Sequence, residues 1–553
     1  MNPERRRMLG ALLGAASAQA LGGALRAQPI RWPREAQPAP PGPTPGPTTG
    51  NPGNPGSPGV QAWRLLDEGA VERLGPPGPP REFRGLWVAS VDNIDWPSRR
   101  GLPAVVQQRE IQAIVDLAAG LNLNAIVLQV RPACDALYLS TFEPWSEFLT
   151  GQSGQAPDVP YDPLAMWVRA AHAKGIQLHA WINPFRARHP KSRKPDAPSH
   201  VSRARPELVR AYGDYLWLDP GDPRVHDLTL GVVRDLLTRY DLDALHIDDY
   251  FYPYPIPKVE FDDAATYGRY QQGGGKLARD DWRRDNVDRF VERLHREVHA
   301  TRPQAMLGIS PFGIWRPGHP AGVKSMDPYV KIHADARKWL QEGWVDYFAP
   351  QLYWPMASKE QPFEPIMDWW IAQNTKGRHV WPGLYMSKVG AKEGKPWPLD
   401  EIVRQVQSTR TRPGARGHVL FSAVALVEDR QGLRGAMRAI NHVPTLVPSS
   451  PWIGAMAPLT PTASGVSLGG SAGRPGTVGI SMGPGDPRGS FRWVVGKLYG
   501  ERWEFDIVPG AVQRVEAPAV LTPERAGPQI LSHVAVWASD RLGNLSRPVV
   551  LAP

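Results

Sequence analysis

Ala244-Leu245-His246-Ile247-Asp248-Asp249-Tyr250 decides the fold class of this 553-residue chain, because the run is short, mostly apolar and contains two adjacent carboxylates near its end. A helical pattern of apolar residues, Arg224–Tyr240, comes before it, and a second, Arg283–Thr301, comes after it. A short apolar run between two helical patterns is typical of a buried parallel strand whose connections are helices. The stretch therefore predicts an α/β fold with a parallel sheet.

The same alternation repeats outward from this stretch in both directions. Eight runs are predicted as strands: Phe83–Ser90, Ala125–Pro132, Gln177–Pro184, Ala244–Tyr250, Met306–Gly313, Asp346–Trp354, His379–Met386 and His418–Leu426. Helical patterns lie between them, and eight strand-then-helix units predict a (β/α)8 TIM barrel over residues 81–442. The alternative is an open doubly wound sheet, which favours fewer strands and a glycine-rich phosphate turn after the first. The sequence has no such turn.

The chain changes character after the predicted barrel. From residue 450 to residue 553, short strand-like runs such as Phe491–Val495 and Trp503–Ile507 alternate with Pro and Gly. This pattern predicts a C-terminal all-β domain, a β-sandwich of the fibronectin-III or immunoglobulin type. Packing is the preferred interpretation of its role, and ligand binding is the alternative.

The first 80 residues predict an export signal and a linker. Arg5, Arg6 and Arg7 precede the uncharged run Met8–Leu25, and small residues suited to cleavage follow, so residues 1–27 are interpreted as a signal resembling the twin-arginine type. A membrane anchor is the alternative, but the many Gly and Ala residues favour cleavage. Residues 28–80 are rich in Pro and Gly and predict a disordered linker. We therefore expect a periplasmic or extracellular protein with no membrane span after cleavage.

Charge and motifs narrow the function classes. The formal charge of +10 favours polyanionic partners, and export argues for cell-wall polymers or lipid headgroups rather than nucleic acid. The single cysteine, Cys134, excludes an intramolecular disulfide and a thiolate metal cluster. No HExxH motif, clustered histidines, P-loop or dinucleotide fingerprint is evident, and no GxSxG run lies at a predicted strand-to-helix elbow, so we predict neither a metal nor a cofactor.

The two adjacent carboxylates are the strongest candidate for chemistry. Catalytic groups of a TIM barrel project from the carboxyl ends of its strands, which is where Asp248 and Asp249 lie. Burying both is costly unless they are paired, protonated or used, whereas a capping or ion-pairing role is the structural alternative. Tyr250 and Tyr252 beside them suit contacts with sugar faces.

Other predicted strand ends also carry polar or aromatic groups. The further candidates for ligand contact are Trp87, Asp92, Gln129, Arg131, Asp135, His179, Trp181, Asn183, Trp315, Gln351, Tyr353 and Trp354. For each one, a structural hydrogen bond inside the barrel is an equal alternative. Polar groups at six of eight strand ends together favour a functional site.

Several of these segments resemble one known family. They are Glu82-Phe83-Arg84-Gly85-Leu86-Trp87-Val88, Leu128-Gln129-Val130-Arg131-Pro132, Glu143-Pro144-Trp145-Ser146, His179-Ala180-Trp181-Ile182-Asn183-Pro184, His246-Ile247-Asp248-Asp249-Tyr250-Phe251-Tyr252-Pro253, Ser310-Pro311-Phe312-Gly313 and Pro350-Gln351-Leu352-Tyr353-Trp354. In this order they resemble the glycosyl-hydrolase-like family 10 barrel, over residues 82–440. The resemblance implies an exported hydrolase of β-1,4-linked amino-sugar glycan, with peptidoglycan strands lacking stem peptides as substrate and cell-wall or divisome proteins as partners.

The mechanism stays open at this point. In a substrate-assisted scheme, Asp248 would orient the 2-acetamido group of the sugar, Asp249 would act as general acid, and Tyr353 would support the acetamido carbonyl. A competing scheme pairs one of these Asp residues with Asp92, Asp135 or Glu143. Arg131, Arg186 and Arg316 are candidates for binding the carboxylate of muramic acid, and for each one a scaffold salt bridge is an equal alternative. A non-catalytic glycan-binding protein, or a hydrolase of another exported polysaccharide, is the alternative function.

Overall fold

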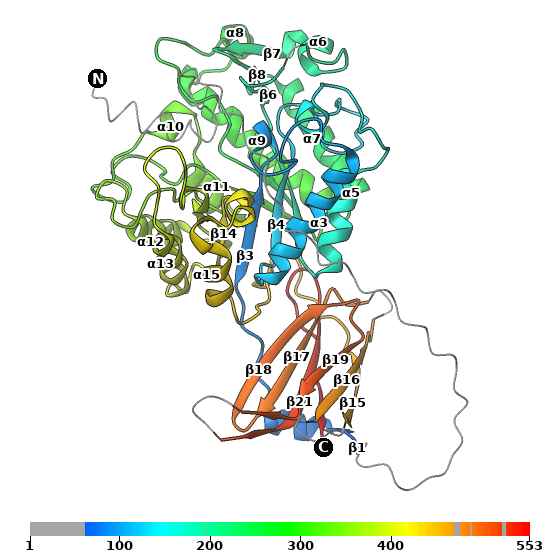
Figure 1. Ribbon diagram of the computed structural model, residues 1–553. Coiled ribbons are helices and arrows are strands. Elements are labelled where there is room, and N and C mark those ends of the chain that lie inside the picture. The colour runs from blue at the N-terminus through cyan, green and yellow to red at the C-terminus, as the bar shows by residue number, and fades with distance from the viewer. Residues whose placement is uncertain (1–60, 194, 469–475, 487–488, 523–526) are drawn as a thin grey trace. The chain divides into compact units, whose positions relative to one another are not determined.

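The computed structural model describes residues 61–468 apart from residue 194, and residues 476–486, 489–522 and 527–553 (Figure 1). The described chain forms two compact units, one of residues 81–455 and one of residues 61–80 with residues 456–553. The predicted signal, residues 1–27, and residues 28–60 of the predicted linker lie outside the described residues.

The first unit is built on one parallel sheet. In spatial order its strands are β12 (His379–Val380), β11 (Tyr347–Phe348), β10 (Met306–Ile309), β9 (Ala244–Ile247), β5 (Gln177–Ile182), β4 (Ala125–Arg131), β3 (Phe83–Val88), β14 (Gly417–Leu420) and β13 (Gly383–Leu384). The two ends of this order belong to one stretch, residues 379–384. The Trp381 N–H donates to the Phe348 carbonyl on one side, and the Val419 N–H donates to the Pro382 carbonyl on the other. The sheet thus closes on itself, which confirms the predicted TIM-like α/β barrel.

Helices follow the strands and surround the sheet (Figure 1). The longer ones are α3 (Ala104–Gly120), α5 (Pro163–Ala173), α7 (Pro223–Arg239), α8 (Ala264–Gln272), α9 (Arg279–Thr301), α11 (Ala336–Glu342), α12 (Phe363–Gln373), α13 (Leu399–Arg410) and α15 (Leu433–Ile440). Short turns of helix are α4 (Glu147–Thr150), α6 (Val201–Ala204), α10 (Pro328–Lys331) and α14 (Ala423–Val427). The start of α7 shows the local cause: Asp222 accepts the Arg224 N–H, and Pro223 occupies the first turn.

A small antiparallel sheet extends the loop between β5 and α7. It consists of β6 (Arg186–Arg188), β8 (Tyr215–Leu218) and β7 (Val209–Tyr212). The sequence analysis did not predict it, because its strands are only three or four residues long and lack clear alternation. It places Trp217 and Arg186 near the carboxyl end of β9, where the Trp217 indole N–H donates to the Phe251 carbonyl at 2.8 Å.

The interior of the barrel is filled by interlocking aromatic and histidine side chains. The hydroxyl of Tyr347 lies 2.9 Å from Nδ1 of both His179 and His246. Gly308 is required beside this ring, because a Cβ there would lie 1.9 Å from the Tyr347 Cζ. The barrel is therefore a packed core, and only its ends are open to ligands.

The second unit contains two antiparallel sheets. One consists of β1 (Gln61–Ala62), β15 (Thr462–Leu468), β16 (Thr477–Gly483) and β19 (Arg514–Pro518). The other consists of β18 (Arg502–Pro509), β17 (Arg492–Tyr499), β21 (Gln529–Ser539), β22 (Val549–Ala552) and β2 (Arg64–Leu65), with β20 (Val520–Leu521) paired to β21. Side chains such as Ile480 and Trp493 form a shared core between strands of both sheets. The predicted all-β unit is present, and its fibronectin-III or immunoglobulin class stays a prediction.

The linker prediction is wrong for residues 61–74. Strand β1 pairs with β15, strand β2 pairs with β22, and residues 68–74 form helix α2 (Glu68–Leu74). The physical reason is Trp63, which is 8% exposed in the core of the second unit and donates to the Ser467 hydroxyl at 2.9 Å. The buried indole and the two strand pairings together hold these residues in the unit.

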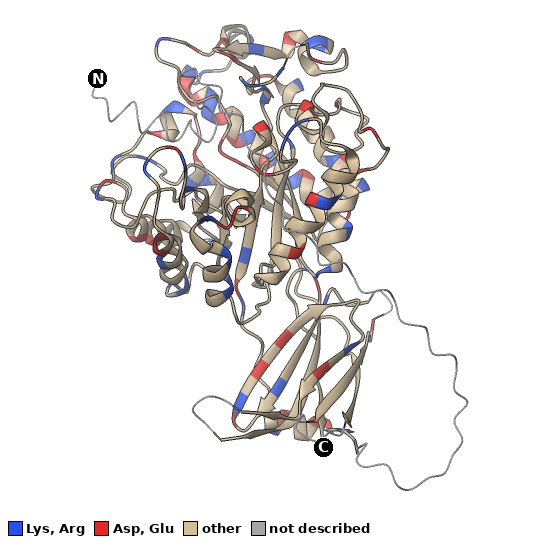
Figure 2. Cartoon of the chain, viewed as in Figure 1, with Lys and Arg blue, Asp and Glu red and all other residues tan. Residues whose placement is uncertain are grey.

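Acidic and basic residues are interspersed along the helices around the barrel (Figure 2). None of the described helices combines the length and the apolar composition that crossing a bilayer requires.

Candidate active site

Asp248 and Asp249 follow directly after β9, at the carboxyl end of the barrel. Each residue is 4% exposed. Their side-chain hydrogen-bond donors are the neutral groups of Asn183, Tyr254 and Gln351, and no Lys or Arg of the described chain forms an ion pair with either carboxylate. Two adjacent buried carboxylates without a cationic partner are costly when both are charged. The arrangement therefore favours one proton held between them.

A chain of hydrogen bonds across the barrel fixes Asp248. The Asn183 Nδ2 donates to both Asp248 oxygens, at 2.8 and 2.7 Å. The Asn183 Oδ1 accepts from the Gln129 Nε2 at 2.6 Å. The Gln129 Oε1 in turn accepts the backbone N–H groups of Ser90 and Val91, at 3.0 and 2.9 Å. Because backbone donors set the orientation of Gln129, they also set the orientation of the Asn183 amide, so Asn183 presents only N–H groups to Asp248.

Asp249 has its own polar neighbours. It accepts the Tyr254 hydroxyl at Oδ2, and the Gln351 side chain also hydrogen-bonds to it. The Gln351 Nε2 donates to the Ser310 carbonyl at 2.9 Å, which holds this side chain at the end of β10. The structure thus places Gln351, a predicted site residue, at the carboxylate pair.

Arg186 is the positively charged residue that acts electrostatically on both carboxylates. It donates from Nη2 to the Asn183 Oδ1 at 2.8 Å, and its Cζ lies 5.0 Å from the centre of the Tyr250 ring. This guanidinium lowers the pKa of Asp248 and of Asp249, but its effect is smaller than that of burial. From the sequence, Arg186 was a candidate ligand for muramic acid, with a scaffold salt bridge as the equal alternative.

Burial dominates the acidity of the pair. Burial, together with the charge of Asp249, raises the pKa of Asp248 to about 7. Burial also raises the pKa of Asp249 above the ordinary carboxyl value. Because the two groups interact, the higher pKa belongs to the pair, which retains one proton near neutral pH. A carboxylic acid that is protonated near pH 7 is suited to general acid catalysis.

Aromatic side chains cluster around Tyr353, which interacts electrostatically with both carboxylates. Tyr353 stacks on Tyr385 with ring centres 4.7 Å apart, and Phe421 lies 5.8 Å from Tyr353. Trp354 packs against Phe312 at 5.6 Å. The sequence analysis missed Tyr385 and Phe421, although both directly follow strands of the barrel. Aromatic faces beside an acid are the usual means of holding sugar rings.

Comparisons with known proteins decide the family. The sequence profile described as glycosyl hydrolase-like 10 matches residues 82–398. The chain belongs to this family. It is 37% identical over 395 residues to the glycosyl hydrolase YngK of Bacillus subtilis, covering 69% of this chain and 76% of that protein. It is 32% identical over 367 residues to the glycosyl hydrolase DigH of Escherichia coli K12, covering 61% of this chain and 82% of that protein.

Solved structures with a similar fold have lower sequence identity to this chain than these two relatives have. The glycoside hydrolase domain of PgaB (BpsB) from Bordetella bronchiseptica is 16% identical, with a TM-score of 0.43, and the match covers 65% of this chain and 99% of that domain. An endo-β-1,4-mannanase from Thermotoga petrophila is 9% identical, with a TM-score of 0.38, and the match covers 87% of this chain and 98% of that protein.

The structure corrects the predicted ligand contact of Arg131. This side chain is fully buried and donates to both Glu143 oxygens, with distances of 2.6 to 3.0 Å. Its Nη1 also donates to the Asn183 carbonyl at 2.6 Å. A guanidinium with these partners supports the end of β5 and is not available to a substrate carboxylate.

Asp92 and Asp135 also have structural partners in place of the predicted ligand. Asp92 lies in a short 3-10 turn (Val91–Asn93) and forms an ion pair with Lys191. Asp135 is 5% exposed, accepts the Ala133 N–H at 2.9 Å, and has its pKa raised to about 6 by burial. Both predicted ligand contacts are replaced by structural ones.

Five further predicted residues fall into packing roles. Trp87 and Trp181 belong to the barrel core, and the buried His179 bonds to Tyr347. Tyr252 is 2% exposed and packs on Phe261 and His333. Trp315 donates to Asp335 at 2.9 Å and stacks on Trp369. The sequence could not distinguish these residues, because aromatic and histidine side chains serve cores and ligand sites equally well.

The pH dependence of stability tests the raised acidity. A carboxyl whose pKa is raised by folding stabilises the fold below its unfolded pKa, and this contribution is lost as the pH rises through the folded pKa. Asp249→Asn removes one of the two charges. We therefore expect Asp249→Asn to gain stability relative to wild type as the pH rises. The difference in unfolding free energy, variant minus wild type, should be about 1–3 kcal/mol larger at pH 8 than at pH 5.

Thermal unfolding at the two pH values measures this difference. Val105→Ala, at a 51% exposed position on α3, is the control and should differ from wild type equally at both pH values. An Asp249→Asn variant whose difference from wild type does not change with pH would contradict a raised pKa in the pair.

Proposed function

We propose that this chain is an exported glycoside hydrolase that cleaves β-1,4-linked amino-sugar glycan, with peptidoglycan strands lacking stem peptides as substrate. Membership of the glycosyl hydrolase-like 10 family and the names of YngK and DigH support hydrolysis of glycosidic bonds. The arginine-led signal pattern at the amino terminus supports export. The second unit is proposed to be a fibronectin-III-like or immunoglobulin-like packing module.

The single observation that carries the proposal is the carboxylate pair. Asp248 and Asp249 are adjacent, nearly buried, without a cationic partner, and hold a raised pKa at the end of the barrel where TIM-barrel chemistry takes place. A glycan-binding cleft gains nothing from a buried neutral acid, whereas a leaving glycosidic oxygen needs one.

The hydrogen bonds support different roles for the two carboxylates. Both Asp248 oxygens accept N–H groups from Asn183, so a proton on Asp248 would face a donor. Asp249 also accepts hydrogen bonds, but the Tyr254 hydroxyl at its Oδ2 can turn and accept instead, so the shared proton favours Asp249 and Asp248 stays ionised. In the proposed first step, Asp249 gives its proton to the glycosidic oxygen as the bond from that oxygen to C1 breaks.

The sugar's own acetamido group completes the proposed mechanism. Its carbonyl oxygen bonds to C1 while Asp248 holds the acetamido N–H and Tyr353 supports the carbonyl side. Water then adds to C1, returns a proton to Asp249 and frees the acetamido group. A protein nucleophile is disfavoured, since Asp92, Asp135 and Glu143 are engaged by Lys191, the Ala133 N–H and Arg131 respectively.

Incubation with peptide-free peptidoglycan strands, followed by mass spectrometry of the soluble products, tests the proposed function. We expect new reducing ends that increase with time, and the product masses assign the cut to the muramic acid or the glucosamine side. Chitin oligomers and a β-1,4-mannan are the substrate controls, which should be cut slowly or not at all. Intact strands retained on the protein would instead indicate a non-catalytic glycan-binding protein.

A further inference from the structure

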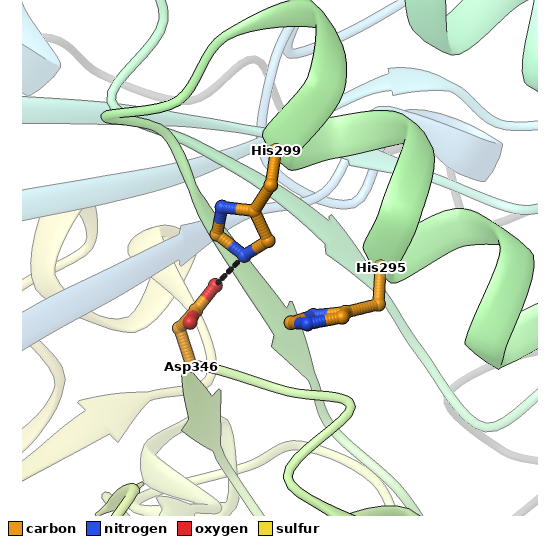
Figure 3. A group of neighbouring side chains, drawn as sticks. All are labelled: His295, His299 and Asp346. Carbon is orange, nitrogen blue, oxygen red and sulfur yellow. Dashed lines mark ion pairs between the residues drawn. The ribbon is translucent and has the colours of Figure 1, made fainter. Parts of the chain in front are cut away.

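Two histidines and an aspartate meet at the opposite end of the barrel from the carboxylate pair. His295 and His299 lie four residues apart on α9 and therefore project from the same face of this helix. Asp346 immediately precedes β11 (Figure 3). One potential ligand atom from each of the three residues lies within 4.8 Å of the other two, and the His299 Nε2 is 3.0 Å from the Asp346 Oδ2.

The aspartate of this cluster is held in place by neutral donors. Its Oδ2 accepts the Leu307 N–H at 2.7 Å, and its Oδ1 accepts the Trp452 indole N–H at 2.9 Å. Such bonds orient a carboxylate without neutralising it, as the outer partners of metal ligands do. Both Asp346 oxygens are thus held by donors that carry no charge, and its Oδ2 also lies 3.0 Å from the His299 Nε2.

One of the two histidines has a buried ring nitrogen without a hydrogen-bond partner. The Nδ1 of His295 is buried and has no hydrogen-bond partner in the described chain. An imidazole nitrogen that no group of the described chain uses is available to ligate a metal. A hydrogen bond from His299 to Asp346 explains two members of the cluster, but it does not explain the buried, unpartnered nitrogen on the third.

We propose that His295, His299 and Asp346 form a binding site for Zn²⁺ or a similar divalent transition metal. Two imidazoles and one carboxylate suit zinc, whereas Ca²⁺ and Mg²⁺ prefer oxygen-only sets. His299 is 25% exposed, which leaves room for water as a fourth ligand. The site joins α9 to the start of β11, so its metal stabilises the barrel and takes no part in the proposed hydrolysis.

The charges around the site set its strength. Arg378 acts electrostatically on both Asp346 and His295, and its Cζ lies 4.9 Å from the ring of Trp452. This guanidinium opposes a bound cation, so we expect weaker binding than in a closed four-ligand zinc site. The sequence analysis missed the site because only the spacing of His295 and His299 is visible in the sequence, and the third ligand comes from a separate segment.

Calorimetric titration of the tag-free, chelator-treated full chain with ZnCl₂ tests the proposal. We expect one equivalent to bind, and the Tm to rise by about 3 °C at a zinc concentration near 100 times the Kd. His295→Gln and His299→Gln should each weaken binding at least about 10-fold. Co²⁺ absorption in place of Zn²⁺ reports the donor geometry independently of stability.

His442→Gln, at an exposed histidine, is the matched control and should leave the titration unchanged. Zinc binding that persists unweakened in both His295→Gln and His299→Gln, or the absence of saturable binding in the folded wild type, would overturn the site. Either result would leave a plain histidine–aspartate hydrogen bond. Neither result bears on glycan cleavage, which is measured separately.

Discussion

Asp249→Asn is expected to lower kcat/KM for cleavage of peptide-free glycan strands by about 10²- to 10⁴-fold, the usual contribution of a general acid. The variant keeps the size of the side chain and can still accept the Tyr254 hydroxyl, so the fold and glycan binding should remain. The loss arises because the glycosidic oxygen no longer receives a proton as it leaves. Rates from reducing-end assays, together with glycan affinity by calorimetry, measure the two effects separately.

A change of leaving group makes this test specific for the role of Asp249. In a 2,4-dinitrophenyl glycoside the phenolate leaves without protonation, so Asp249→Asn should cleave this substrate at a rate much closer to wild type. Asp248→Asn should lose activity on both substrates, because Asp248 acts on the acetamido group and not on the leaving oxygen. Asp227→Asn, at a surface position of α7, is the matched control. Equal losses on both substrates for Asp249→Asn would refute its assignment as the acid.

Glu143→Ala is expected to destabilise the barrel by about 3–5 kcal/mol, because it leaves the fully buried Arg131 guanidinium without its counter-ion. Arg131 would retain only its bonds to neutral groups such as the Asn183 carbonyl. Chemical denaturation of the wild type and the variant measures the difference. Since Asn183 holds Asp248, we also expect the remaining folded enzyme to be less active.

An exposed ion pair provides the comparison for this prediction. Glu297→Ala removes the partner of Arg234, whose side chain is 61% exposed, and should cost no more than about 1 kcal/mol. A double variant, Arg131→Met with Glu143→Leu, should recover much of the lost stability, as buried ion pairs replaced by apolar residues often do. A Glu143→Ala variant as stable as Glu297→Ala would contradict the structural role of Arg131.

The sequence predicted the barrel well because periodicity is a local property. Every one of the eight predicted strands corresponds to a strand or pair of strands in the structure, and Asp248 and Asp249 lie at the strand end where they were expected. The strand predicted at Asp346–Trp354 is regular only at Tyr347–Phe348. The rest of that stretch turns outward, where Gln351 and Tyr353 meet the site.

The hydrogen-bond and packing partners of individual side chains could not be predicted from the sequence. Arg131 and Glu143 are twelve residues apart, and no sequence pattern indicates that Arg131 pairs with Glu143 and not with a substrate. Tyr385 lies next to Tyr353 only because the last strands close the barrel. Such neighbours depend on tertiary contacts, which composition and spacing do not specify.

The hydrogen bonds that run from Ser90 and Val91 through Gln129 and Asn183 to Asp248 have a consequence for how this sequence can vary. Each link needs a side chain with both an acceptor and a donor, so Gln129 has few functional substitutes: glutamate cannot donate, and leucine can do neither. Sequence drift at these inner positions is therefore expected to be rare, while the outer loops that meet the glycan remain free to diverge. The acid centre can in this way be inherited unchanged as substrate preference evolves.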